Sequence, residues 1–116
     1  MSELAYGSDY TQSEAFRLAK EKLIAAIERV IVLNIRNIES QIEKYKMYQM
    51  PDWGEYGITL DELDQFNHET ELGIQVRKYF NIRGWYVGCL NGMNVRLIIS
   101  TPEARADFRR AQEERA

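Results

Sequence analysis

Residues 11–50, TQSEAFRLAKEKLIAAIERVIVLNIRNIESQIEKYKMYQM, contain neither proline nor glycine and decide the architecture of the chain. Apolar residues recur there at spacings of three and four, which keeps one face of a helix apolar; they are Phe16, Ala19, Leu23, Ile27, Val30, Ile38, Ile42 and Tyr45. A helix through most of this stretch would be roughly 55 Å long. A compact domain of this size is only about 35 Å across. The helix therefore either breaks near its middle or projects and needs a partner.

The middle of the stretch, LIAAIERVIVL at residues 23–33, is apolar on several faces and has to be covered on several sides. Three interpretations stay open: packing against the chain's own sheet, a seam between subunits, and a break near Asn34 to Asn37. The seam is favoured by residues seven positions apart, namely Ile24, Ile31, Ile38 and Tyr45. Four further large apolar residues complete our predicted partner or oligomer contacts, namely Tyr48, Trp53, Trp85 and Ile98.

Composition limits the class of protein. A chain of 116 residues, 45% hydrophobic and 28% charged, is typical of a single soluble domain spanning residues 1–116. The lone cysteine, Cys89, cannot form an intramolecular disulfide, and the sequence starts without a basic and apolar leader. We therefore expect a reducing, cytoplasmic location. The apolar block at 23–33 is too short for a membrane span of ~20 residues.

The net charge of −3 is distributed unevenly. Residues 51–71 hold seven acids and no lysine or arginine, whereas residues 72–100 hold four bases and no acid. Acids at a helix start and bases at its end complement the helix dipole, which is the explanation that we favour. The alternative is electrostatic docking between copies or onto a charged partner.

Around the long helix the sequence predicts an α+β domain with a small three-stranded mixed sheet. Residues 1–10 are expected to form an extended arm, and Thr11 forms a capping box with Glu14 that begins the helix. Alternating apolar residues at 56–60 predict the first strand, and the acids that follow fit one helical turn. This strand, the second helix and the next strand would make a right-handed crossover.

The remainder, within residues 51–100, predicts a second helix and a hairpin. The helix is expected over residues 68–81, capped by Asn67, with Gly73 allowing a close approach. Asn91-Gly92 is the preferred centre of a two-residue hairpin turn, which pairs Leu90 with Met93. Both faces of this hairpin are then substantially apolar, so a second element or another subunit has to cover one of them.

The strand at 95–99, rich in branched residues, is the expected middle strand of the sheet. Within residues 101–116, Thr101 caps a final helix with Pro102 at its first position, running to about residue 115. Its apolar stripe is narrow, so it predicts a weakly docked C-terminal helix.

Motifs for catalysis are scarce. Cys89 would need a histidine base to act as a nucleophile, and the only histidine is His68. A small buried hydrophobe is the simpler interpretation of Cys89. Asp61, Asp64 and His68 have the spacing that would align metal ligands on a continuous helix, but Asn67 interrupts that helix and a solvated acidic turn is the explanation that we favour. We predict no cofactor and no enzymatic activity, and keep a metal-dependent hydrolase as the least favoured alternative.

A binding site for nucleic acid or a nucleotide is a further alternative. Arg83, Trp85, Tyr86 and Arg96 lie around the hairpin, where aromatic rings and guanidinium groups could stack on bases in a pocket between subunits. The overall acidity offers no broad field for phosphates, so this partner is not favoured.

The second half also resembles, in outline, small uncharacterised proteins encoded by bacteriophages. The resemblance lies in a helix that leads through an Arg-Gly-Trp turn into an aromatic hairpin, here YFNIRGWYV at 79–87 and LIIS at 97–100. It implies a virion component, or an accessory protein in the host cytoplasm that binds a host or defence factor. Our leading hypothesis is a non-enzymatic homo-oligomer, most simply a dimer, that presents a surface to another protein.

Overall fold

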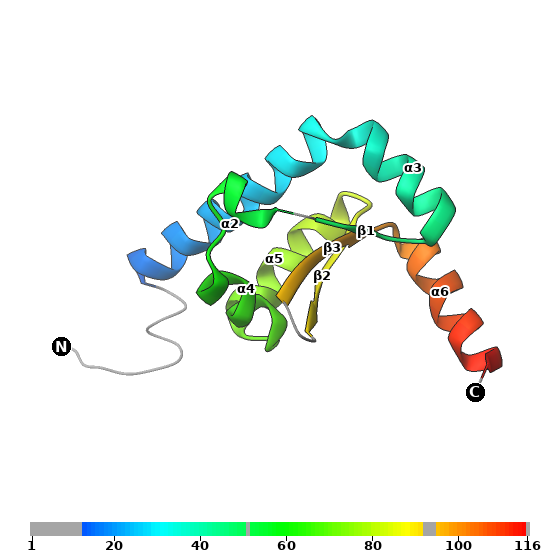
Figure 1. Cartoon of the computed structure of the whole chain (residues 1–116). Helices are drawn as coiled ribbons and strands as arrows, with labels where there is room; N and C mark the ends of the chain where they lie inside the picture. Colours follow the sequence, from blue (N-terminus) through cyan, green and yellow to red (C-terminus); the bar gives the residue numbers. More distant parts are fainter. Residues whose placement is uncertain (1–12, 51, 92–94, 116) are drawn as a thin grey trace.

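The computed structural model describes residues 13–50, 52–91 and 95–115 and is an α+β domain, as predicted (Figure 1). The helices are α2 (Glu14–Leu33), α3 (Ile35–Tyr45), α4 (Leu60–Asn67), α5 (Glu71–Ile82), α6 (Pro102–Arg115) and the short 3₁₀ helix η1 (Trp53–Tyr56). The strands are β1 (Tyr48–Gln49), β2 (Tyr86–Asn91) and β3 (Val95–Ser100). The predicted arm at 1–10 and the predicted cap Thr11 lie outside the described residues.

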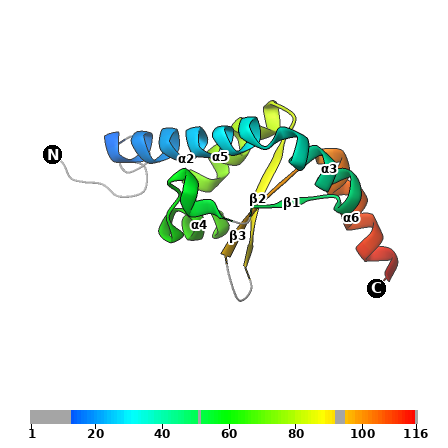
Figure 2. The same cartoon turned by 45° about the horizontal axis from the view of Figure 1, so that its top comes forward.

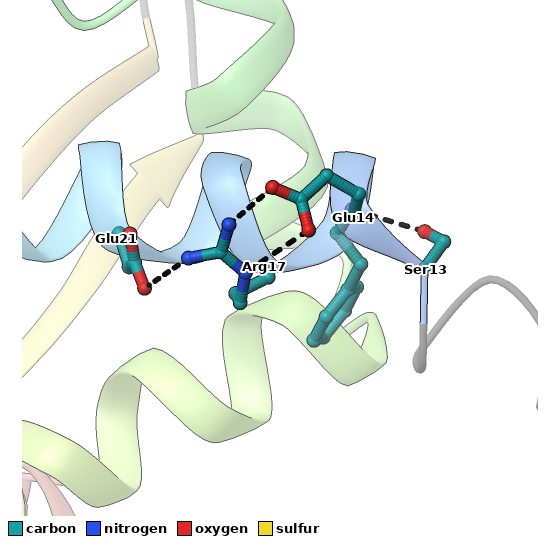
Figure 3. A network of polar contacts seen from close by, with 5 residues as sticks. Ser13, Glu14, Arg17 and Glu21 are labelled. Atoms are coloured by element: carbon teal, nitrogen blue, oxygen red, sulfur yellow. Dashed lines mark hydrogen bonds and ion pairs between the residues drawn. The ribbon is translucent and has the colours of Figure 1, made fainter.

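Helix α2 begins at Glu14 because Ser13 caps it: the Ser13 hydroxyl accepts a hydrogen bond from the Phe16 amide at 3.1 Å. Arg17 bridges two acids on the exposed side of the first turns, Glu14 and Glu21 (Figure 3). Such exposed pairs stabilise a helix only weakly. Phe16 is buried and anchors this end of the helix to the core.

The long helix is broken at Asn34, so the prediction of one helix over residues 11–50 is wrong and the interpretation with a break is confirmed. The Asn34 side-chain amide donates to the Val30 carbonyl and to the Tyr56 hydroxyl, both at 3.0 Å. Helix α3 ends where Lys46 adopts a left-handed conformation with φ 69°. The two helices therefore arch over the sheet, and α3 packs against β1 and β3 (Figures 1 and 2).

The sheet is antiparallel throughout, in the order β1-β3-β2. The predicted mixed sheet and its crossover are therefore wrong, whereas the central place of β3 is confirmed. The predicted strand at 56–60 is also wrong: Ile58 is buried in a loop, and Thr59 caps α4. A capping box holds this helix start, because Thr59 accepts from the Glu62 amide and the Glu62 carboxylate accepts from the Thr59 amide.

The hairpin register differs from the predicted one by three residues, because Leu90 pairs with Arg96. The predicted partner, Met93, lies outside the described residues. Since an odd shift moves one strand's residues to the other face, the two faces carry other residues than a Leu90–Met93 pair would give them. Val87, Leu97 and Ile99 share the face that joins the main core.

Three residues, 68–70, join α4 to α5, so the helix predicted to start at His68 starts at Glu71. Thr70 caps it in place of the predicted Asn67, accepting from the Gly73 amide at 3.2 Å. A Cβ on Gly73 would lie 2.9 Å from the Phe66 carbonyl oxygen, which confirms the predicted close approach. Thr101 caps α6 as predicted, accepting from the Ala104 amide at 3.1 Å.

Candidate functional site

The candidate site is an apolar groove between the C-terminal half of α2 and the C-terminal end of α5. Its volume is about 610 Å³, and it is lined by Ala25, Glu28, Arg29, Ile31, Val32, Leu33, Phe80, Arg83 and Trp85. Val32 and Leu33 are 71% and 67% exposed, whereas Ile82, which is 82% exposed, lines a different cavity on α5. Val32 and Leu33 therefore place two large apolar side chains in water at the groove.

The groove follows from the composition of α2 and from the break that ends it. Ile27, Val30 and Ile31 are buried, while Val32 and Leu33 on the other side of the same turns stay exposed. Helix α2 ends at Leu33, and after Asn34 the chain changes direction so that α3 packs on β1 and β3. The apolar end of α2 is thereby left facing Trp85 and the end of α5.

Polar side chains fix the side of the groove next to α5. The Tyr79 hydroxyl donates to the Glu28 carboxylate at 2.6 Å, and this hydrogen bond raises the pKa of Tyr79. The Arg83 guanidinium lies 3.5 Å from the centre of the Tyr79 ring and donates to the Tyr79 carbonyl at 2.8 Å. Arg29 is exposed, and within the described parts of the chain it forms no ion pair. Both signs of charge thus border one apolar surface.

The predicted oligomer contacts are only partly available. Ile38, Tyr48 and Ile98 are buried within a single chain, so a partner cannot reach them and these predictions are wrong, whereas Ile31 is 8% exposed and lines the groove. Their burial follows from the bend at Asn34, which brings α3 over β1 and β3. Ile24 and Trp53 are half-buried and pack against the core.

Two members of the predicted contact set keep exposed surface for a partner. Tyr45 is 56% exposed at the end of α3, and Trp85 lines the groove. The four residues spaced seven positions apart, which were predicted to form a seam, therefore do not share one exposed surface. The exposed residues Val32, Leu33 and Ile82 were not predicted, although the apolar block at 23–33 signalled that several faces of α2 need cover.

The alternative ligand set is divided between two places. Arg83 and Trp85 line the groove, whereas Tyr86 lines a different cavity beside α6. Arg96 is exposed on β3, on the face of the hairpin that also carries Tyr86. Within a single chain these four residues therefore do not line one cavity, and the pocket between subunits stays a prediction.

The residues weighed for catalysis or metal binding offer little chemistry. His68 Nε2 lies 3.0 Å from Asp64 Oδ1 at the exposed end of α4. Among the residues that the structure describes, no three His, Cys, Asp or Glu side chains gather as metal ligands, so Asp61 does not complete a site. Cys89 donates to the Leu63 carbonyl at 3.6 Å, and burial raises its pKa to about 12. A thiol with that pKa is not a ready nucleophile at neutral pH.

No protein-family model matches the chain, and no curated protein or solved structure is significantly similar to it. Within the described ranges, none of the helices combines the length and the apolar character that crossing a membrane requires.

Proposed function

We propose that the protein is a non-enzymatic binding module that acts as a homodimer, and that the groove between α2 and α5 is where the second copy docks. The observation that carries this proposal is the exposure of Val32 and Leu33 beside the groove. Fully burying such a side chain stabilises an interface by roughly 1.5–3 kcal/mol. Two copies that shield each other's residues gain this contribution twice.

The shape of the surface favours a second copy of this chain over an unrelated partner. The end of α2 projects two large apolar side chains, and the hollow next to it is lined by Phe80 and Trp85. A surface that carries both a projection and a hollow can pair with itself about a two-fold axis, because each copy inserts its projection into the other. Aromatic residues such as Trp85 are enriched at the centre of interfaces of this kind.

The charges at the border agree with self-pairing. Arg29 and Glu28 are consecutive residues at the groove, so a two-fold axis between them would place each copy's arginine near the other's carboxylate. The length of residues 11–50 and the two apolar faces of the hairpin give little further support for assembly. The bend at Asn34 and the burial of Ile98 let one copy cover these apolar surfaces by itself.

The experiment is a measurement of molar mass by light scattering from about 1 to about 100 µM protein. Wild type is expected to approach the dimer mass, and Leu33→Asp to stay monomeric, because burying a carboxylate in an apolar interface is unfavourable. Leu18→Asp is the matched control: Leu18 is on the same helix, is 52% exposed and does not line the groove. A wild-type monomer at the highest concentration would overturn the proposal, as would loss of the dimer in both variants.

A small-ligand site is the second candidate, because about 610 Å³ is within the usual size of ligand pockets. Arg83 beside Trp85 suits a planar anionic ligand such as a nucleotide. A nucleotide that binds the folded protein raises its melting midpoint, and Arg83→Ala should abolish that shift.

A role in a phage virion, or as an accessory protein that binds a host factor, stays a prediction from the resemblance.

A further inference from the structure

Arginine side chains from two helices line a second cavity, of about 440 Å³, between the α4–α5 turn, β2 and α6. Arg77 comes from α5, and Arg105 and Arg109 come from α6 one helical turn apart. Asn67 and Glu69 also line this cavity. A concentration of guanidinium groups is unexpected in a chain of net charge −3, and it marks a place where an anion would be held.

Two of these arginines are positioned by aromatic rings. The Arg77 guanidinium lies over the Phe66 ring at 4.6 Å and also donates to the Phe66 carbonyl. The Arg105 guanidinium lies 5.1 Å from the centre of the Tyr86 ring. Stacking fixes the plane of a guanidinium group without using its N–H donors, so most of the five donors of each remain available to a ligand.

The cavity keeps a positive charge because carboxylates do not neutralise these arginines. Among the described residues, the ion pairs do not include Arg77, Arg105 or Arg109. Glu69 is the one acidic residue among those that line the cavity. By contrast, Arg110, the next residue along α6, is paired with Asp107.

The surrounding elements favour a nucleic-acid backbone as the source of the anion. Residues 68–70 join α4 to α5, and a turn of three to four residues also joins the two helices of helix-turn-helix proteins, which place the second helix in the major groove of DNA. In protein–DNA complexes arginine side chains and backbone amides bind phosphates and so fix the register of the protein on the duplex. Here Asn67 at the end of α4, the turn residue Glu69 and the three arginines border the same cavity.

We propose that this cavity binds backbone phosphates of double-stranded DNA. Arg109 and Arg105 contact phosphate oxygens from α6, and Arg77 contacts them from α5. The exposed acids on α4, among them Asp61 and Asp64, repel phosphates and so confine the contact to the arginine-lined cavity. Two or three phosphates neutralised by arginine give a slope of log K against log salt of roughly −2 to −3. Binding is therefore modest and strongly salt-dependent, and it does not require the dimer.

The test is fluorescence anisotropy of a labelled duplex of about 20 base pairs, titrated with the full chain at several salt concentrations. Wild type is expected to bind with the stated slope. Arg109→Ala should weaken binding about three- to tenfold at low salt and reduce the slope by about one. Arg110→Ala is the matched control, because Arg110 is a neighbour on α6 that does not line the cavity; its affinity should stay within about twofold of wild type.

Three results would overturn the proposal. The first is a wild-type protein that does not bind the duplex at low salt, and the second is an equal loss in Arg109→Ala and Arg110→Ala. The third is displacement of the duplex by inorganic phosphate or a mononucleotide at similar concentration, which would assign the cavity to a small phosphate ligand. Circular dichroism of both variants confirms that they fold. Leu33→Asp should bind the duplex with unchanged affinity per chain, which separates this result from that of the dimer.

Discussion

Gly73 is the residue at which α5 comes closest to the end of α4. Alanine is normally preferred to glycine inside a helix by about 1 kcal/mol. Here an added Cβ would lie 2.9 Å from the Phe66 carbonyl oxygen, so backbone atoms would have to move. Overpacking of this kind costs about 1–3 kcal/mol. We therefore predict that Gly73→Ala lowers the free energy of unfolding by about 1 kcal/mol or more, measured by urea denaturation.

Gly54→Ala provides the control for that prediction. A Cβ on Gly54 would lie 3.5 Å from Asp52 Oδ1, which is an ordinary contact with a movable side chain. The free energy of unfolding of this variant should stay within about 0.5 kcal/mol of wild type. A Gly73→Ala variant as stable as Gly54→Ala would show that the two helices are not tightly packed.

Sequence reasoning works at this scale where a residue's own chemistry is decisive. A glycine inside a helix predicted a close approach, and Thr101 before Pro102 predicted a helix cap; both are confirmed. The guanidinium of Arg77 over the Phe66 ring was not predictable, because these residues are on different helices and 11 positions apart. Nothing in the sequence fixes how two such helices meet.

At the scale of elements, the bend between α2 and α3 depends on a contact with a distant loop. The Asn34 amide donates to the Tyr56 hydroxyl at 3.0 Å and to the Val30 carbonyl. Tyr56→Phe removes the first of these bonds and leaves a half-buried amide with one partner fewer. We predict a loss of about 1 kcal/mol in the free energy of unfolding, measured by urea denaturation.

The Tyr56→Phe prediction has a control on α3. Tyr45→Phe should be neutral, because Tyr45 is mostly exposed and the described residues offer its hydroxyl no hydrogen bond. In Asn34→Ala the Tyr56→Phe change should cost almost nothing more, since the shared bond is already absent. Additive losses in the double variant would contradict the role given to this bond.

Elements were predictable where local signals agreed and were misjudged where two signals competed. Residues 56–60 alternate like a strand, yet Thr59 and Glu62 also form the sequence signature of a capping box, and the helix start prevailed. Strand β1 has only two residues, too few for any periodicity to appear. The hairpin was recognised from Asn91-Gly92, but this dipeptide does not fix the pairing, and the observed register has Asn91 opposite Val95.

At the scale of the whole molecule, the predicted long helix does not outreach the domain, because it is divided into α2 and α3 at Asn34. The molecule measures 53 × 33 × 30 Å, and its longest dimension includes α6, which runs away from the sheet (Figure 1). The sequence could show that the centre of α2 needs cover on several sides. It could not show which side the chain covers itself, because that depends on where α5 and Trp85 lie. The groove is the part left uncovered.

The pH dependence of stability follows from three groups in different parts of the fold. Burial raises the pKa of Tyr48 and of Cys89, in the latter from 9.0 to about 12, and the hydrogen bond to Glu28 raises the pKa of Tyr79. The folded protein thus keeps protons that the unfolded chain has already lost. Since stability falls with pH wherever the unfolded state binds fewer protons, it should be full below about pH 9 and decline above it.

Thermal unfolding at intervals from about pH 7 to about pH 11 tests this directly, and the melting midpoint should fall over the upper half of that range. Cys89→Ala should shrink the decline that begins near pH 9, because it removes the group with the largest difference between its folded and unfolded pKa. Tyr45→Phe, which removes an exposed phenol, should leave the decline as it is in wild type. A midpoint that stays constant up to pH 11, or a Cys89→Ala variant that declines as steeply as wild type, would mean that the thiol is not shielded from water as the packing of β2 against α4 requires.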